Sequence, residues 1–214
     1  GNFFDLFKNK KIALKYIYCI IIGSPIWFVI GILIGRAPEF ANEMGIVGTS
    51  GLEREYSIMF CYTGLVFGDI ASGMLSQLLK SRKKAFYIFY VFCISLILIY
   101  TNLSNATATT YYIMITLLGF SAGFWAMFVT VASEQFGTNL RSTTATTAPN
   151  FVRGSLVIIA LLFDYLRSTD GKFLQLGSLT SAAIAVTVLL FTISFWAVYR
   201  LPETFGKDLD YVEE

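Results

Sequence analysis

Apolar residues run through this chain in six long stretches, and polar residues gather between them. At about 1.5 Å of helical rise per residue, each stretch is long enough to cross a hydrocarbon layer roughly 30 Å thick. Because lipid offers no hydrogen-bond partners, the backbone of each stretch is expected to be helical. The pattern therefore predicts six transmembrane helices, at residues 16–35, 56–79, 85–103, 111–133, 146–166 and 177–199.

The composition supports a membrane protein in contact with a lipid bilayer. The chain has 214 residues, of which 56% are hydrophobic and 14% are charged, whereas about a quarter of the residues of ordinary proteins are charged. The remaining alternative is a soluble protein with unusually apolar buried helices. We predict an all-α membrane protein in which residues 1–15 end a cytoplasmic loop, residues 16–199 form a six-helix transmembrane bundle, and residues 200–214 form a cytoplasmic tail.

Basic residues are concentrated on one side of the predicted spans. Eleven of the 16 lysines and arginines fall on the side of both termini, and four fall on the other side. The positive-inside rule then places both termini in the cytoplasm, across a plasma membrane or a bacterial inner membrane. Topology thus accounts for the net charge of +2, which indicates no nucleic-acid partner. The eleven are Lys8, Lys10, Lys11, Lys15, Lys80, Arg82, Lys83, Lys84, Arg141, Arg200 and Lys207.

The residue types present exclude several chemistries. The chain has no histidine, which excludes serine–histidine catalysis, histidine-ligated zinc and histidine proton relays within it. Cys19, Cys61 and Cys93 fall within predicted spans, where we interpret them as small core residues and not as disulfide partners. The Gly-x-Ser-x-Gly pattern at residues 119–123 lies inside a predicted span and has no histidine to serve it, and no carboxylate pair lies at mid-membrane. We therefore expect no enzyme, no metal site and no cofactor.

Small residues recur four positions apart in several spans. This spacing puts small side chains on one helix face and lets backbones approach closely. Helix packing explains it, and the same spacing also provides smooth faces on which helices could slide or rock. The residues are Gly31 and Gly35 in the first span, Gly64, Gly68 and Ser72 in the second, and Gly119 and Gly123 in the fourth.

Pro25 and Pro149 predict interrupted helices early in the first and fifth spans. Each proline removes an internal hydrogen bond and frees a carbonyl in the preceding turn. Lipid tolerates such an interruption where a neighbouring helix or a water-filled cavity satisfies the freed group. A kink that serves only packing is the simpler interpretation.

Arg153 is the strongest single indication of function. It lies about seven residues inside the predicted fifth span, where an unpaired cation costs about 3 kcal/mol or more. No acidic residue occupies a matching central depth, and Asn150 lies on the same side of the helix. A guanidinium beside an amide suits a carboxylate, sulfonate or phosphate. The alternatives are pairing with an absent partner helix and snorkelling to the inner surface.

Aromatic residues fall into two groups. Trp27 and Trp125 lie mid-span, so they are not explained as anchors at the membrane interface. Either could line a substrate cavity or fill the core, and each indole N–H needs a partner. A second group lies near span ends, which is typical of interface anchors: Tyr111, Tyr112, Trp196 and Tyr199.

Charged residues also gather at the cytoplasmic ends of the predicted spans. Pairs of carboxylates and cations there would cross-link helix ends, and such pairs are stronger when partly desolvated. They would form while an inner gate is closed and break when it opens. Alternatively, these charges only set the topology. The residues are Asp69, Arg82, Glu134, Arg141 and Glu203.

Three features resemble the C-terminal six-helix half of the major facilitator superfamily. Segment 202–210, PETFGKDLD, is similar to the P-E-T-K-G-x-x-L-E signature after the last helix of sugar porters, with phenylalanine in place of lysine. Segment 134–143, EQFGTNLRST, resembles E-x-F-P-T-x-x-R-G-T, with Gly137 where proline is usual. Arg153 is in register with an arginine of metabolite–proton symporters and organic-anion carriers, and Asn150 matches the symporter pattern N-x-G-R, with Val152 in place of glycine.

The resemblance covers nearly the whole chain and has consequences for architecture. It implies twelve helices in two six-helix halves, with the substrate held between them near the membrane midplane and carried as the halves rock. This chain would supply helices seven to twelve, and residues 1–15 would end the central cytoplasmic loop. The partner would be an N-terminal six-helix half. A carboxylate that couples transport to a proton would belong to that half.

We therefore expect a secondary active transporter of a small organic solute, an organic anion or carboxylate, that works by alternating access and is coupled to protons. One alternative is a porter of sugars or other neutral metabolites. Another, of a different class, is a stand-alone six-helix membrane scaffold or half-transporter that pairs with another chain. The expected substrate-binding residues are Arg153, Asn150, Trp27 and Trp125, and the expected gating residues are Asp69, Arg82, Glu134, Arg141 and Glu203.

Overall fold

A computed structural model describes residues 2–46, 52–170, 173–208 and 210–213, and within these ranges the chain forms helices and no strand. Leu209 of segment 202–210 lies outside the described residues. Six helical segments are long and apolar enough to cross a membrane, which confirms the predicted number and type of spans. They are Lys10–Ile34, Arg54–Leu78, Arg82–Thr101, Ala108–Glu134, Thr138–Arg167 and Leu179–Arg200.

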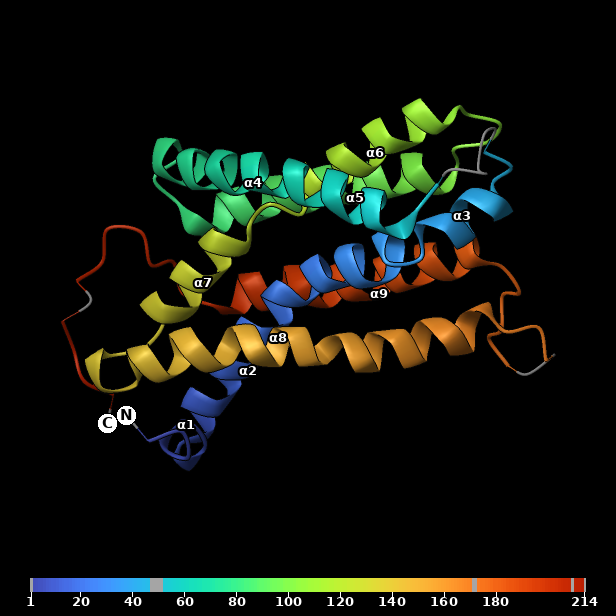
Figure 1. Cartoon of the computed structure of the whole chain (residues 1–214). Coiled ribbons are helices and arrows are strands. Elements are labelled where there is room, and N and C mark those ends of the chain that lie inside the picture. Colours follow the sequence, from blue (N-terminus) through green and yellow to red (C-terminus); the bar gives the residue numbers. More distant parts are fainter. Residues whose placement is uncertain (1, 47–51, 171–172, 209, 214) are drawn as a thin grey trace.

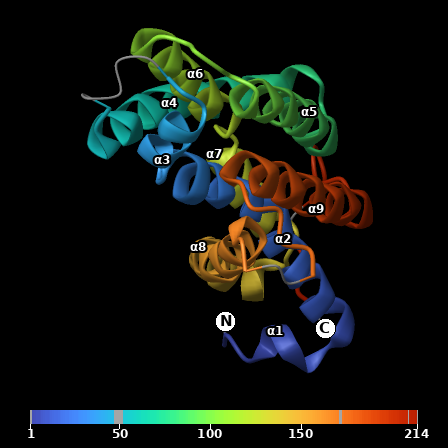
Figure 2. The same cartoon turned by 90° about the vertical axis from the view of Figure 1, so that its right-hand side faces the viewer.

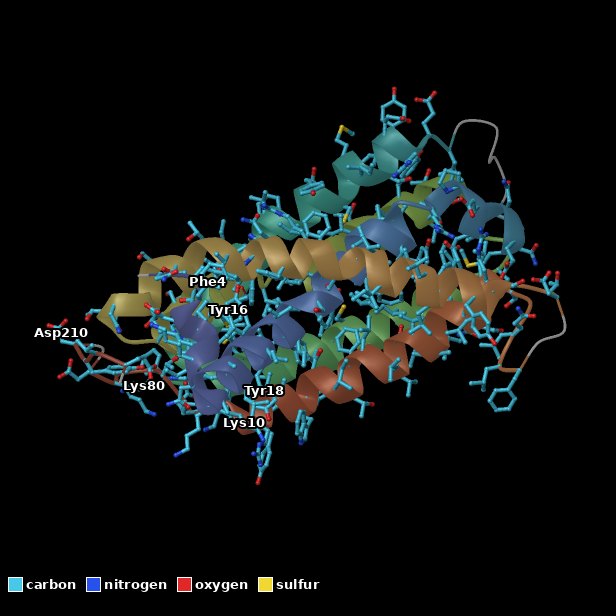
Figure 3. The ribbon with its side chains drawn as sticks, turned by 90° about the horizontal axis from the view of Figure 1, so that it is seen from below. Phe4, Lys10, Tyr16, Tyr18, Lys80 and Asp210 are labelled. Carbon is cyan, nitrogen blue, oxygen red and sulfur yellow. The ribbon has the colours of Figure 1, made fainter. Side chains whose placement is uncertain are left out.

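Nine α-helices and one π-helical segment build the described part of the chain (Figure 1). The first span joins α2 to the π-helical η1, and the fourth joins α6 to α7 across a break. Both termini lie at the same end of the bundle. Lys10, Lys80 and Asp210 lie toward that end as well (Figure 3). The elements are α1 (Asp5–Lys8), α2 (Lys10–Phe28), η1 (Val29–Ile34), α3 (Ala37–Glu43), α4 (Arg54–Leu78), α5 (Arg82–Thr101), α6 (Ala108–Ser121), α7 (Trp125–Glu134), α8 (Thr138–Arg167) and α9 (Leu179–Arg200).

Polar side chains mark where four of these helices begin. Each accepts a hydrogen bond from a backbone N–H of the first turn, which would otherwise lack a partner. The capping residues are Asn9 for α2, Ser81 for α5, Thr107 for α6 and Ser178 for α9.

The helices are arranged in three layers (Figures 1 and 2). Helices α4, α5 and α6 form one layer, α2 and α9 lie in the middle, and α8 covers the opposite side. In the most apolar 18-residue stretch of α4 and of α8, 22% of the residues are buried, against 50–67% in the other four spans. These two helices therefore leave most of their apolar surface uncovered, on α4 at Val66, Phe67, Ile70 and Met74 and on α8 at Val157, Ile158 and Leu161.

The predicted glycine stripes bring α4 and α6 into close contact. A Cβ built at Gly119 would overlap the backbone of Cys61, and one at Gly64 would overlap the carbonyl of Thr116. Gly123 meets the backbone of Gly68 in the same way. The spacing of small residues is therefore used for helix packing, which confirms that interpretation.

The break in helical structure falls in a different span from the ones predicted. Helix α8 continues through Pro149, and α2 continues through Pro25 before the chain becomes π-helical at Val29. The carbonyl of Ile21, one turn before Pro25, accepts a hydrogen bond from the Ser194 hydroxyl of α9 at 3.1 Å. A neighbouring helix thus satisfies the freed group, and the predicted interruptions are wrong. The chain instead breaks between α6 and α7, where neither flanking helix contains proline.

Tyr111 is buried and is not an interface anchor. Its hydroxyl bonds to the hydroxyl of Tyr100 and to the carbonyl of Ala37, each at 2.7 Å. The Tyr100 hydroxyl in turn donates to the carbonyl of Leu33 at 3.2 Å. The two tyrosines therefore supply partners to one carbonyl at the end of η1 and one at the start of α3, a role that nearness to a span end did not suggest. Trp196 and Tyr199 are exposed, as expected.

Charged residues hold the end of the bundle opposite the termini. The Arg36 guanidinium forms two hydrogen bonds with the Asp164 carboxylate of α8, at 2.5 and 2.9 Å. The Glu43 carboxylate accepts from the N–H groups of Leu179 and Thr180, the first two residues of α9. Burial opposes ionisation of Glu43, but these hydrogen bonds outweigh it and lower the pKa of its carboxyl.

Gly119→Ala should destabilise the α4–α6 contact, because the added methyl group meets backbone atoms of Cys61 that cannot rotate aside. We expect a loss of about 1–3 kcal/mol, measured as a lower melting temperature of the protein in detergent. The matched control is Gly73→Ala in α4, where an added Cβ meets nothing within 4 Å. That variant should keep or slightly raise the melting temperature, because alanine favours helix over glycine. Equal losses in both variants would contradict the close contact.

Candidate functional site

Arg153 lies at the middle of α8, the longest helix described. The helix begins at Thr138, well before the predicted start of the fifth span at position 146. Arg153 is therefore nearer to the centre of its span than the sequence pattern indicated. Its side chain is exposed on the surface of this chain, on a helix whose apolar face is largely uncovered.

The four predicted substrate-binding residues come together around Arg153. Its guanidinium carbon lies 5.4 Å from the ring centroid of Trp125 and 5.9 Å from that of Trp27, which is cation–π geometry. The two indole rings pack edge to face, with centroids 6.2 Å apart and planes at 78°. The Asn150 side-chain oxygen accepts from the guanidinium at 3.3 Å. One cluster thus unites residues of α2, α7 and α8.

A cavity of about 130 Å³ lies beside this cluster. Tyr62 of α4 lines it, a residue that sequence reasoning missed. The sequence held one indication of its position. Tyr62 lies seven residues, or about two helical turns, before the predicted gating residue Asp69 and therefore on the same face of the helix. The lining residues are Ile26, Trp27, Ile30, Tyr62, Leu65, Trp125 and Arg153.

The break between α6 and α7 places Trp125 in the cavity wall. Trp125 is the first residue of α7, and the next residue, Ala126, donates its N–H to the Asp69 carboxylate at 3.0 Å. Gly123 allows this turn to lie directly against the backbone of Gly68 and Asp69. Asp69 therefore fixes the start of α7. The structure assigns it this contact and not a pairing with the other predicted gating residues.

Hydrogen-bond donors of the cluster exceed its acceptors. Arg153 forms no ion pair with any residue in the described ranges. The Nε1–H of Trp27 is buried and has no hydrogen-bond partner, an arrangement that costs about 1–3 kcal/mol. The aromatic faces stabilise the guanidinium without neutralising its charge. The arrangement is therefore suited to a negatively charged group that accepts hydrogen bonds.

A second cluster lies at the end of the bundle that carries the termini. The Arg82 guanidinium at the start of α5 bonds to the Glu134 carboxylate at the end of α7, at 2.9 and 3.3 Å. The Thr204 hydroxyl donates to the same carboxylate at 2.7 Å. The guanidinium carbon of Arg82 lies 5.4 Å from the ring centroid of Phe205. Segment 202–210 thus joins α5 to α7 through two side chains that the sequence did not single out.

Glu203 binds the first turn of α5. Its carboxylate accepts from the Ser81 hydroxyl and from the N–H groups of Arg82 and Lys83, the latter two at 2.9 and 3.2 Å. Burial opposes its ionisation, but these bonds and one from the N–H of Phe205 outweigh it and lower the pKa of the carboxyl. Three predicted gating residues, Arg82, Glu134 and Glu203, therefore belong to one network.

Arg141 occupies a different place in the fold. Its Nε donates to the carbonyl of Phe136 at 3.4 Å, within the turn that joins α7 to α8. The C-terminal segment lies against the same turn, because Thr138 donates its N–H to the carbonyl of Tyr211 at 2.7 Å. A Cβ at Gly137 would lie 2.6 Å from that carbonyl. Glycine at this position therefore lets the chain end dock on the turn.

A groove of about 580 Å³ runs between α4 and α7 beside the Arg82–Glu134 pair. It opens along the surface that these two helices leave uncovered. The residues that line it are Gly73, Met74, Gln77, Leu78, Arg82, Ala126, Met127 and Thr130.

These observations define a helical chain with six spans of membrane length and a cationic, aromatic site midway along one of them. Comparison with protein-family models and with curated protein sequences finds no match to this chain.

The Glu203 carboxylate gives a pH-dependent prediction. Its folded-state pKa lies below the ordinary value of 4.5, so ionised Glu203 stabilises the fold above about pH 4.5, and this contribution disappears as the pH falls through the lowered pKa. Glu203→Gln should cost about 1–3 kcal/mol at neutral pH, because an amide cannot accept every bond that the carboxylate accepts. Melting temperatures measured from pH 7 to pH 3 should show the difference between the two proteins narrowing below about pH 4.5.

The control for this series is Glu55→Gln. Glu55 is an exposed carboxylate in the first turn of α4, so its substitution should change the melting temperature little at any pH. A Glu203→Gln deficit that stays constant down to pH 3 would show that the ionised carboxylate contributes nothing.

Proposed function

We propose that this chain is one six-helix half of a secondary transporter for a small organic anion, and that it works by alternating access. The observation that carries the proposal is the unpaired Arg153 guanidinium at the middle of a membrane-length helix. A central cation is costly unless it meets a partner or water, and here it borders a cavity. An anionic substrate would provide that partner during each transport cycle.

The uncovered faces of α4 and α8 support the second part of the proposal. Both helices contribute side chains to the cavity, Tyr62 from α4 and Arg153 from α8, and both expose apolar residues on either side of it. A second six-helix half that covers these faces would bury the apolar surface and close the site between the two halves. Three sequence features favour the major facilitator superfamily as the source of this architecture. They are residues 202–210, residues 134–143, and Arg153 together with Asn150.

The distribution of charged residues bears on the orientation of the chain in the membrane and on the coupling of transport to protons. The excess of lysine and arginine at the end that holds both termini favours a cytoplasmic location for that end. No Asp or Glu of the described residues borders the cavity. If transport is coupled to a proton, the titrating carboxylate is therefore expected on the second half.

A porter of sugars or other neutral solutes is the alternative within the same class. It would leave the Arg153 charge without a counter-charge, so the geometry favours the anion. A stand-alone scaffold that pairs with another chain would use the same uncovered faces but would not need the cavity. Transport measurements separate these two from the main proposal.

Arg153→Ala should abolish saturable uptake of the anionic substrate by the full-length carrier in proteoliposomes, because the central positive charge is lost. Arg153→Lys keeps the charge but loses the planar fork, and we expect its apparent affinity to fall at least about tenfold. A screen of labelled organic acids identifies the substrate first. Arg54→Ala, at an exposed position at the start of α4, serves as the control and should transport normally. Normal apparent affinity in both Arg153 variants would remove the binding role.

We also propose that the network of Arg82, Glu134 and Glu203 holds the cytoplasmic gate closed. Glu134→Gln removes the charge that pairs with Arg82, so the gate should open more often. A Gln77→Cys reporter in the groove between α4 and α7 should then react severalfold faster with an impermeant maleimide. The native cysteines are buried and should add little background. Asp208→Asn, at an exposed position in the tail, is the control, and an unchanged labelling rate in Glu134→Gln would contradict the gating role.

A further inference from the structure

The cavity beside Arg153 lacks hydrogen-bond acceptors for the donors it presents. A guanidinium carries five N–H donors, and Asn150 accepts from one of the Arg153 nitrogens. The Trp27 Nε1–H has no partner at all. None of the described residues that line the cavity is acidic. An occupant that satisfies these donors must itself supply acceptor oxygens.

The charge of the lining limits how many anionic groups the occupant carries. Arg153 is the single charged residue among the described lining residues. A second or third carboxylate on the occupant would find no counter-charge on the described residues of this chain, and an unpaired charge in an apolar environment is costly. A sugar would present hydroxyl donors, and the lining has no carboxylate to accept from them. One anionic group is the best match.

The remaining walls define the body of the occupant. Trp27 and Trp125 present two ring surfaces at 78°, and Ile26, Ile30 and Leu65 complete an apolar surround. The cavity volume is about 130 Å³, and an apolar protein cavity of about 150 Å³ is known to hold benzene. A single flat ring therefore fits this volume, where it can pack offset or edge to face against an indole of the wall.

We propose that the cavity binds a monocarboxylate with one flat apolar ring, and that the Trp27 indole N–H donates to its carboxylate together with Arg153. This inference rests on the proposed function and adds the substrate class and a second donor. The carboxylate lies at the mouth of the cavity against the guanidinium, and the ring lies against Trp125. Trp27 thereby has two roles, as a wall and as a hydrogen-bond donor.

The first test compares ligands on the unaltered full-length protein in nanodiscs, by isothermal titration calorimetry. Benzoate should bind, and benzamide, which has the same shape without the charge, should bind at least about tenfold more weakly. Citrate and glucose should show no saturable binding. Benzamide that binds as tightly as benzoate, or citrate or glucose that binds more tightly, would overturn the proposal without any need for a variant.

The second test isolates the indole N–H. Trp27→Phe keeps an aromatic ring and removes the donor, so benzoate affinity should fall about tenfold, as expected for one hydrogen bond to a charged group. Trp196→Phe makes the same change at an exposed indole outside the cavity and should leave affinity unchanged. Melting temperatures confirm that both variants fold. Unaltered benzoate affinity in a folded Trp27→Phe protein would refute the donor role.

Failure of this inference differs from failure of the proposed function. Arg153-dependent uptake of citrate, or of an aliphatic acid in preference to benzoate, would leave the anion transporter intact and reject only the aromatic monocarboxylate. Uptake that is insensitive to Arg153 would reject both.

Discussion

A backbone carbonyl inside lipid has no water to bond to, and the helices of this chain meet that constraint with side chains from their neighbours. Ser194 bonds to the carbonyl one turn before Pro25, and Tyr90 bonds to the carbonyl of Ile22. Tyr100 and Tyr111 do the same near the end of η1. Because these bonds hold the first span to α5 and α9, and tie α6 to the segment that follows the span, an irregular helix remains a fixed part of the bundle.

Beside the cavity, some polar groups lack a hydrogen-bond partner. Asp69 satisfies the start of α7 and so fixes Trp125, but the Trp27 Nε1–H has no hydrogen-bond partner, and none of the described residues that line the cavity is acidic. The site lies between the two helices that are least covered by the rest of the chain. Unused donors and uncovered apolar surface therefore coincide. This coincidence links the proposed ligand to the proposed second half.

Charge is used differently at the two ends of the bundle. At one end, Arg36 with Asp164 and Glu43 with the start of α9 tie neighbouring helices together. At the other, Glu203 caps α5 while Arg82 pairs with Glu134. Carboxylates here bind helix N-termini as well as cations, because each N-terminus presents free N–H groups and a partial positive charge. Charged residues near span ends thus have structural partners beyond their effect on topology.

The number of spans, their approximate limits, the buried cysteines and the position of Arg153 inside a span could be predicted from the sequence alone. Solubility in lipid depends on the local run of apolar residues, so it can be read without knowing the fold. The break before Trp125, the burial of Tyr111 and the contribution of Tyr62 could not. Proline marks where a hydrogen bond is missing, but only the packed neighbours decide whether the helix breaks there. The sequence placed Arg153, Asn150, Trp27 and Trp125 within predicted spans. Tertiary packing alone brought them into one cluster, because they come from helices far apart along the chain.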